Sequence, residues 1–169
     1  YDPWKSEIGR GALSALGLGV DFRPGDVASR LNFCTVDDAG NVTDRRAGRI
    51  PTETGRKLCD LLDAVDIPGI QVSVAAEMEY RAGVVFRGEG LSDGVGDSDP
   101  QGTSIPPKLL VAQDQESELM VEVANEFLVQ AREILADQEP ANMVLMRGFG
   151  RYPELAQFDD VYGLRALGI

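Results

Sequence analysis

Three arginines lie within five residues of one another in the stretch Asp44 to Ile50, DRRAGRI. A guanidinium group presents a planar fork of donors that matches phosphate or carboxylate oxygens, and it stays charged at physiological pH. Asp44 can hold one of these forks in place, and Gly48 allows the backbone to turn close to a ligand. The stretch therefore predicts a binding site for an anion.

A solvated basic turn, whose arginines pair with acids elsewhere on the surface, is the alternative interpretation of this stretch. The composition of the whole chain favours the binding site. The chain carries 13 arginines and 3 lysines, although a soluble surface has no reason to prefer arginine so strongly.

The net charge of -12 and the absence of histidine limit the functions that this chain can have. Nucleic acid requires a broad cationic surface, so we expect no nucleic-acid partner. Histidine is the commonest general base and a common metal ligand, so we expect neither catalytic residues nor a metal site in the chain itself, with a site built from carboxylates alone as the open alternative. Asp97-Ser98-Asp99 lacks the glycine and the distal glutamate of a calcium loop.

The 169 residues suit a single domain of ordinary composition, with 43% hydrophobic and 26% charged residues. No apolar run approaches the roughly 18 to 20 residues that span a bilayer, and no signal peptide is recognisable. We therefore expect no membrane association and a cytoplasmic location. Cys34 and Cys59 are not arranged as CxxC and are expected to be buried, reduced thiols.

Hydrophobic spacing predicts the element order α, β, β, α, β, β, α, β. Thr52 is expected to cap the second helix, and a second arginine-glycine turn is expected over 147–151. The long segment 88–113 has no periodicity and is expected to be a functional or mobile loop. A weakly patterned tail over 152–169 has a short predicted helix near Phe158. The expected helices are 6–16, 52–65 and 114–135, and the expected strands are 25–36, 42–45, 70–78, 80–87 and 143–146.

From Val42 onward, the order β, α, β, β, α, β is the split arrangement of ferredoxin-like folds. The predicted fold class is therefore α+β. We expect a two-layer sandwich in which a mixed, mainly antiparallel sheet carries its helices on one face.

The motifs, taken in order, are EIGRGALSALG over 7–17, GDVASRLNFCTVD over 25–37 and DRRAGRI over 44–50. Shorter pieces follow at 80–81, 91–93, 97–100, 141–142 and 145–148. This combination resembles the archaeal-type 2,3-bisphosphoglycerate-independent phosphoglycerate mutases, and the resemblance covers nearly the whole chain.

The resemblance implies that the chain is one domain of a larger enzyme of the alkaline phosphatase superfamily. It implies an inserted substrate-binding domain over 25–151, between segments 1–24 and 152–169 that lead from and toward a catalytic domain. That catalytic domain is expected to carry a nucleophilic serine and two Mn or Mg ions. The implied reaction passes the phosphoryl group of 3-phosphoglycerate to the serine and returns it to the 2-hydroxyl group. The implied partners are phosphoglycerate and the catalytic domain of the same chain.

The resemblance also carries over to single residues. Asp99 matches the aspartate of the family's Asp-Pro-His motif, whereas Gln101 stands where many relatives have histidine, which leaves the role of that position open. Three arginines are weaker candidates, divided between ligand contact and structural ion pairing. They are Arg30, Arg87 and Arg147. The stronger substrate-binding candidates are Arg45, Arg46, Arg49, Arg81 and Asp99.

Two further functions fit the same residues. A related phosphotransferase could act on another small phosphorylated acid, because arginines alone do not distinguish such substrates. A domain of a different class, such as a non-catalytic phosphate-binding or oligomerisation module, would also use an arginine cluster. Catalytic serine, aspartate and histidine motifs in the flanking sequence would favour the enzyme.

Overall fold

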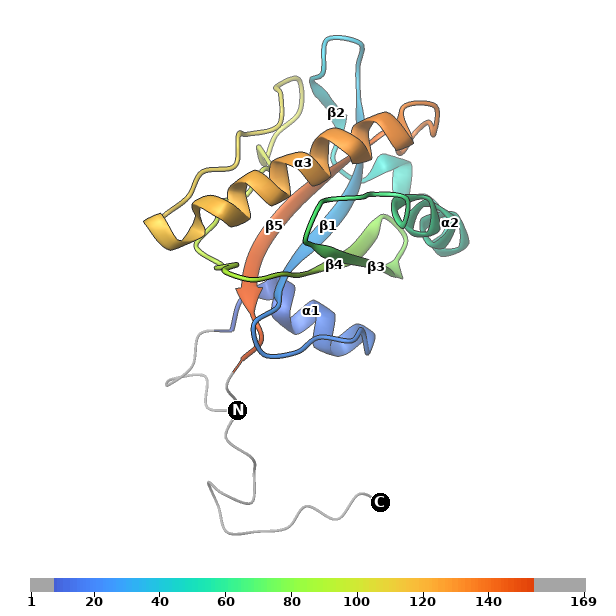
Figure 1. The fold of residues 1–169 in the computed structure, drawn as a ribbon. Helices are drawn as coiled ribbons and strands as arrows, with labels where there is room; N and C mark the ends of the chain where they lie inside the picture. Colours follow the sequence, from blue (N-terminus) through green and yellow to red (C-terminus); the bar gives the residue numbers. More distant parts are fainter. Residues whose placement is uncertain (1–7, 154–169) are drawn as a thin grey trace, which may run out of the picture.

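The computed structural model describes residues 8–153, which form an α+β domain with three α-helices and a five-stranded sheet (Figure 1). The predicted order of helices and strands is confirmed, with two short 3-10 turns in addition. The elements are α1 Arg10–Leu18, β1 Val27–Val36, β2 Val42–Asp44, η1 Ala47–Arg49, α2 Thr52–Leu62, β3 Gln71–Met78, β4 Arg81–Arg87, η2 Gln115–Ser117, α3 Glu118–Leu135 and β5 Met143–Arg151.

Four strands form the body of the sheet in the order β5, β1, β4, β3, and every pairing is antiparallel. This is the strand order of a ferredoxin-like split arrangement. The prediction that this arrangement begins at Val42 is wrong, because β1 is its first strand. β2 is a three-residue strand that pairs with the end of β1, and its Val42 also forms an isolated antiparallel bridge with Ile105.

The predicted two-layer arrangement is confirmed for α2 and α3, which lie together on one face of the sheet, and α1 packs in addition on the opposite face. α2 and α3 pack over the main core, which contains Leu31, Phe33 and Phe127. α1 lies on the opposite face, where it buries Ala28 and Val85 in a smaller cluster (Figure 1). Alternating residues of the strands therefore face two different environments.

Two local predictions are also wrong. The expected turn over 147–151 is the second half of β5, and the strand passes through a bulge at Gly148, whose φ is 64°. Thr52 is the first residue of α2 rather than its cap, and its hydroxyl accepts a hydrogen bond from the Glu79 backbone N–H at 3.0 Å. The predicted helix near Phe158 lies outside the described residues.

The long loop 88–113 contains no helix but is attached along β5. The backbone N–H of Ser98 donates to the carbonyl of Met146 at 2.9 Å, and the Asp97 carboxylate accepts from the Gly148 N–H at 2.7 Å. Leu91, Val95 and Leu110 reach the main core, to which the loop thus adds buried apolar area. Asp97 and Ser98 therefore position the loop.

Two further expectations concern the thiols and the membrane. Cys34 and Cys59 are free and buried, as predicted, and burial raises the pKa of each to about 12. Neither thiol is a nucleophile at neutral pH. Within residues 8–153, no helix is both long and apolar enough to cross a bilayer.

Glycines allow α1 to lie directly on the backbones of β1 and β5. A Cβ added at Gly11 would lie 2.6 Å from the carbonyl oxygens of both Ala28 and Gly148. A Cβ at Gly9 would lie 2.5 Å from the carbonyl oxygen of Phe149. The glycines of the EIGRG motif are therefore required by this close approach, which also fixes the position of Arg10.

We predict that Gly11→Ala lowers the free energy of unfolding by about 1–3 kcal/mol, because backbone atoms must move to admit the methyl group. Gly17→Ala is the matched control in the same helix, since no atom lies within 4 Å of the added Cβ. That substitution should be neutral or stabilise the chain by up to about 1 kcal/mol, because alanine is the better helix former. Urea unfolding followed by circular dichroism measures both. Equal effects would show that α1 is not seated on the strands in this way.

Candidate functional site

The pairing register places arginines in rows across the sheet face on which α1 lies. The first row, under α1, contains Ala28 and Val85. In the next row Arg30 pairs with Arg147 on one side and Gly83 on the other, and in the third row Asn32 pairs with Leu145 and Arg81. Residues two apart along a strand share a face. The part of this face beyond α1 is therefore cationic.

Arg45 and Arg46 reach this face from the turn after β2. The carboxylate of Asp44 accepts hydrogen bonds from the backbone N–H groups of Arg46 at 2.8 Å and Gly48 at 2.7 Å. The sequence predicted that Asp44 would hold a guanidinium group. Its carboxylate instead holds the backbone of the turn. Ala47, Gly48 and Arg49 all have positive φ, at 47°, 62° and 54°. Such strain in residues other than glycine is typical of functional sites.

Asp99 holds two of these arginines. Its side chain is 1% exposed and accepts a bidentate pair of hydrogen bonds from Arg45, with Nε to Oδ1 at 2.9 Å and Nη2 to Oδ2 at 2.6 Å. Arg147 approaches the same carboxylate at 3.5 Å. Asp99 therefore contacts guanidinium groups in this structure, so its part in a binding site is to position Arg45 and Arg147.

The charge state of Asp99 follows from these contacts. Burial by itself would raise the pKa of the carboxyl group. The hydrogen bonds from Arg45 and from the Gln101 backbone N–H, together with the charges of Arg45 and Arg147, outweigh burial and hold the pKa of Asp99 below its ordinary value of 3.8. The hydrogen bond to Asp99 is in turn the main cause of a raised pKa of Arg45. The ion pair is therefore intact at neutral pH.

A small pocket of about 100 Å³ lies where these elements meet. Arg81 lies beside it, next to Asn32 in the sheet register, and its guanidinium carbon is 5.9 Å from the centre of the Tyr80 ring. We refer to this site as the inner pocket. The residues that line the inner pocket are Asn32, Arg45, Arg46, Tyr80 and Arg147.

Buried polar atoms without a hydrogen-bond partner gather on the same face. Among the described residues there are four such side-chain atoms, and each belongs to the face of the sheet that α1 shares with the arginines. A buried polar group without a partner costs about 1–3 kcal/mol, so we expect each of these atoms to have a partner from outside the chain, either water or a ligand. The four atoms are Ser14 Oγ, Arg30 Nε, Asn32 Oδ1 and Arg81 Nε.

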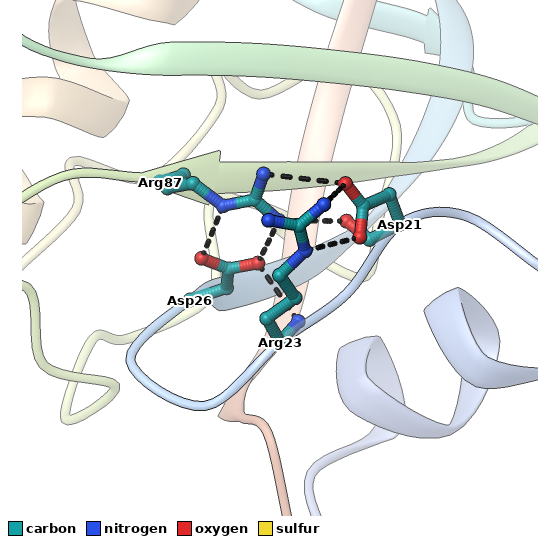
Figure 2. Close-up of polar contacts among 4 residues, drawn as sticks. All are labelled: Asp21, Arg23, Asp26 and Arg87. Atoms are coloured by element: carbon teal, nitrogen blue, oxygen red, sulfur yellow. Dashed lines mark hydrogen bonds and ion pairs between the residues drawn. The ribbon is translucent and has the colours of Figure 1, made fainter.

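Three of the residues singled out in the sequence lie apart from the inner pocket. Arg49 is exposed and does not line it. Gln101 is exposed too, and its backbone N–H donates to Asp99. Arg87, at the far end of β4, donates from Nε and Nη2 to the carboxylate of Asp26 at 2.9 and 2.7 Å and approaches Asp21, which also pairs with Arg23 (Figure 2).

Asp26 is 2% exposed, so Arg87 is placed as its ion-pair partner and not with the arginines of the inner pocket. The pKa of Arg87 is raised, chiefly by its hydrogen bonds to Asp26. The network ties the segment between α1 and β1 to the end of β4 (Figure 2).

Asn32 and Tyr80 line the inner pocket but were not selected from the sequence. Asn32 lies two residues beyond Arg30 on the same strand, so the period of two could have placed both on one face. Tyr80 precedes Arg81 at the tight turn between β3 and β4, where alternation breaks down because Glu79 has a positive φ of 54°. Tyr80 belongs to the 80–81 piece of the family resemblance, but its residue type did not mark it as a binding residue.

A sequence model of the 2,3-bisphosphoglycerate-independent phosphoglycerate mutases matches residues 1–142. The chain belongs to this family. It is 46% identical over 171 residues to a probable phosphoglycerate mutase of this kind from Thermus thermophilus, and the match covers 100% of this chain and 42% of that protein. A probable phosphoglycerate mutase of the same kind from Deinococcus radiodurans is 42% identical, in a match that covers 98% of this chain and 42% of that protein.

A solved structure, the cofactor-independent phosphoglycerate mutase from Thermoplasma acidophilum, matches with a TM-score of 0.83 and 38% sequence identity. The match covers 95% of this chain and 46% of that one. The chain therefore spans less than half the length of these relatives, which confirms that it corresponds to part of a phosphoglycerate mutase.

We predict that Asp99→Asn lowers the free energy of unfolding by about 1–3 kcal/mol at neutral pH, because two guanidinium groups lose a buried anionic partner. A carboxylate whose folded-state pKa lies below 3.8 stabilises the fold above that value, and this stabilisation is lost as the pH falls through the folded-state pKa. The difference between wild type and variant should therefore be constant from neutral pH down to about pH 5 and shrink in stronger acid.

Unfolding in urea across this pH range tests the prediction. Asp93→Asn is the control, because the Asp93 side chain is 42% exposed and its ion pair with Arg151 is long, at 3.8 Å. The asparagine amide oxygen can still accept the hydrogen bond that Asp93 accepts from the Arg151 backbone N–H, so the effect should stay below about 1 kcal/mol. A pH-independent effect of Asp99→Asn would mean that the carboxylate charge does not hold the arginines.

Proposed function

We propose that this chain is the substrate-binding insert of a cytoplasmic, glycolytic phosphoglycerate mutase that interconverts 3-phosphoglycerate and 2-phosphoglycerate. The observation that carries the proposal is the cationic face formed by Arg30, Arg45, Arg46, Arg81 and Arg147, which we call the arginine face. Three of the four unpartnered buried atoms belong to side chains of this face or to Asn32 beside them. The guanidinium groups of the arginine face are preorganised donors that suit the carboxylate and phosphoryl oxygens of a phosphoglycerate.

The backbone supports the placement as an insert. Gly9 lies against Phe149 and Gly150, and the Tyr152 N–H donates to the carbonyl of Asp26 at 3.3 Å. The first and last described segments therefore lie side by side on one domain. This arrangement allows a domain to be inserted in another without separating the two points of connection.

The arginine face would orient the glycerate part of the substrate while the phosphoryl group is held by a serine of the catalytic domain. Fixing the 2- and 3-hydroxyl groups relative to that phosphoserine lowers the entropic part of the barrier. Guanidinium groups also stabilise charge on the phosphoryl oxygens during transfer. Rotation of the glycerate between the two transfers requires contacts that are strong but not covalent, which hydrogen bonds from guanidinium groups provide.

The two Mn or Mg ions of the proposed enzyme do not fit the residues seen here. Across residues 8–153, no three side chains of histidine, cysteine, aspartate or glutamate converge in a way that could hold a metal ion. Asp97 and Asp99, the acids nearest to a metal motif, accept hydrogen bonds from Gly148 and Arg45. We assign the ions to the catalytic domain.

We predict that this chain alone has no mutase activity, because it contains no histidine and both of its thiols are buried with a raised pKa. A coupled assay for the conversion of 3-phosphoglycerate, with Mn supplied, measures this directly. Turnover well above a blank that contains only the metal would show that the chain is a complete enzyme.

We predict that Arg46→Lys in the full-length enzyme lowers kcat/KM by about one to two orders of magnitude. Lysine keeps the charge but offers no planar fork, so long-range attraction survives while bidentate orientation is lost. Arg49→Lys, measured in parallel, decides whether that exposed arginine contributes. Both residues belong to the DRRAGRI stretch.

Arg132→Lys on α3 is the control for Arg46→Lys, because Arg132 is exposed on the helix that covers the opposite face of the sheet. It should retain wild-type steady-state kinetics. If Arg46→Lys behaves like Arg132→Lys, the inner pocket is not the substrate site.

A further inference from the structure

The turn between β3 and β4 forms one wall of the inner pocket. It consists of Glu79 and Tyr80, because Met78 and Arg81 pair with each other at the end of the two strands. Tyr80 lines the inner pocket, and its ring centre lies 5.9 Å from the guanidinium carbon of Arg81. The orientation of both side chains therefore depends on the backbone of this two-residue turn.

Glu79 has a backbone conformation that its residue type disfavours. Its φ of 54° lies in the left-handed region, where a side chain is strained. Two-residue hairpin turns normally have glycine, asparagine or aspartate at such positions. The register also shifts between Ala76 and Met78, so β3 carries an irregularity just before the turn. Strained residues persist only where the surrounding structure holds them, so contacts from another element must fix this turn.

The first turn of α2 supplies those contacts. Thr52 Oγ1 accepts a hydrogen bond from the backbone N–H of Glu79 at 3.0 Å. Gly55, in the same helix, makes room for the other end of that residue, because a Cβ added there would lie 2.5 Å from the Glu79 carbonyl oxygen. On the side of the sheet, the backbone N–H of Phe33 donates to the Tyr80 carbonyl at 2.8 Å. The turn is therefore held between α2 and β1.

The same helix begins directly after another wall of the inner pocket. Arg45 and Arg46 lie in the turn after β2, whose backbone Asp44 holds, and the short segment 47–51 leads from there to Thr52. Ile50 in that segment is 5% exposed and belongs to the main core, so this segment is anchored as well. The start of α2 thus joins two walls of the pocket, one through the chain and the other through a hydrogen bond.

We propose that Thr52 is a positioning residue for the inner pocket. It acts through Glu79, whose left-handed conformation it holds, and thereby keeps Tyr80 and Arg81 in place opposite Arg46. Thr52 contacts the turn and has no need to touch the ligand itself. The proposal deepens the proposed function and rests on it for the identity of the ligand.

Nuclear magnetic resonance of the 169-residue chain tests whether Thr52 holds the turn. Thr52→Val removes the acceptor and keeps the size of the side chain, so the amide resonances of Glu79, Tyr80 and Arg81 should shift. Thr54→Val is the matched control, because it makes the same exchange at a half-buried position in the same turn of α2. It should leave those three resonances in place. Equal shifts in the two variants would overturn the proposal.

Steady-state kinetics of the full-length enzyme test whether the turn serves the ligand. Thr52→Val should lower kcat/KM for 3-phosphoglycerate about three- to tenfold, which corresponds to the loss of one neutral hydrogen bond. In an Arg81→Met background the same substitution should change kcat/KM by less than about twofold, because the side chain that it displaces is already absent. A loss of stability alone would have the same effect in both backgrounds, and that result would overturn the proposal.

Glu79→Gly provides a rescue of the Thr52 variant. Glycine adopts a positive φ without strain, so the turn keeps its shape when the hydrogen bond is lost. The combined variant of Thr52→Val and Glu79→Gly should therefore recover kcat/KM to within about twofold of the wild type. If it stays as slow as Thr52→Val alone, the left-handed turn is not what Thr52 holds.

These experiments distinguish the failure of this proposal from the failure of the proposed function. A full-length enzyme that does not convert 3-phosphoglycerate would overturn the mutase proposal, and the spectra of the 169-residue chain would still decide whether Thr52 holds the turn. An active enzyme whose kcat/KM is unchanged by Thr52→Val would overturn the positioning role and leave the mutase proposal standing.

Discussion

The arginine face depends on a single buried carboxylate. Guanidinium groups on neighbouring strands repel one another, and burial strengthens that repulsion because the surrounding dielectric constant falls. Asp99 offsets it by accepting two hydrogen bonds from Arg45 and lying 3.5 Å from Arg147. The loop that carries Asp99 is held in turn by Ser98, which bonds to Met146 on β5. Without the loop, no carboxylate would fix the orientation of the Arg45 and Arg147 guanidinium groups.

Glycines decide how closely α1 can pack on β1 and β5. Gly9 and Gly11 let α1 lie on the strands. Gly148 allows the β-bulge after which Arg147 pairs with Arg30. A Cβ at Gly148 would lie 2.9 Å from Cβ of Arg10. The same contacts that seat the helix therefore fix Arg10 next to the bulge that precedes Arg147 in the pairing with β1. Packing and binding are coupled here because they use the same residues.

Much of the fold could be predicted from the sequence because strong local periods determine it. The alternation in β1 and β4 and the helical stripe of α3 each identify one element without reference to the rest of the chain. The strand β5 was predicted too short, because Arg147 and Gly148 resemble a turn when only local composition is considered. Its continuation depends on pairing with β1, a contact between residues more than a hundred positions apart.

The site was predictable only in part, for the same reason. The arginines of DRRAGRI could be selected by residue type, and the structure brings Arg45 and Arg46 to one pocket. Arg87 has the same chemistry and yet pairs with Asp26 at the far end of β4, which no local pattern reveals (Figure 2). Residue type thus identifies which side chains can bind an anion, whereas the register of the sheet decides which of them act together. Arg30 and Arg147 belong to one site because they pair across two antiparallel strands. Two arginines in one pair of a ladder repel each other, and here each has a carboxylate at 3.5 Å, Asp99 for Arg147 and Glu77 for Arg30, so the structure can hold both cations in one row of the sheet.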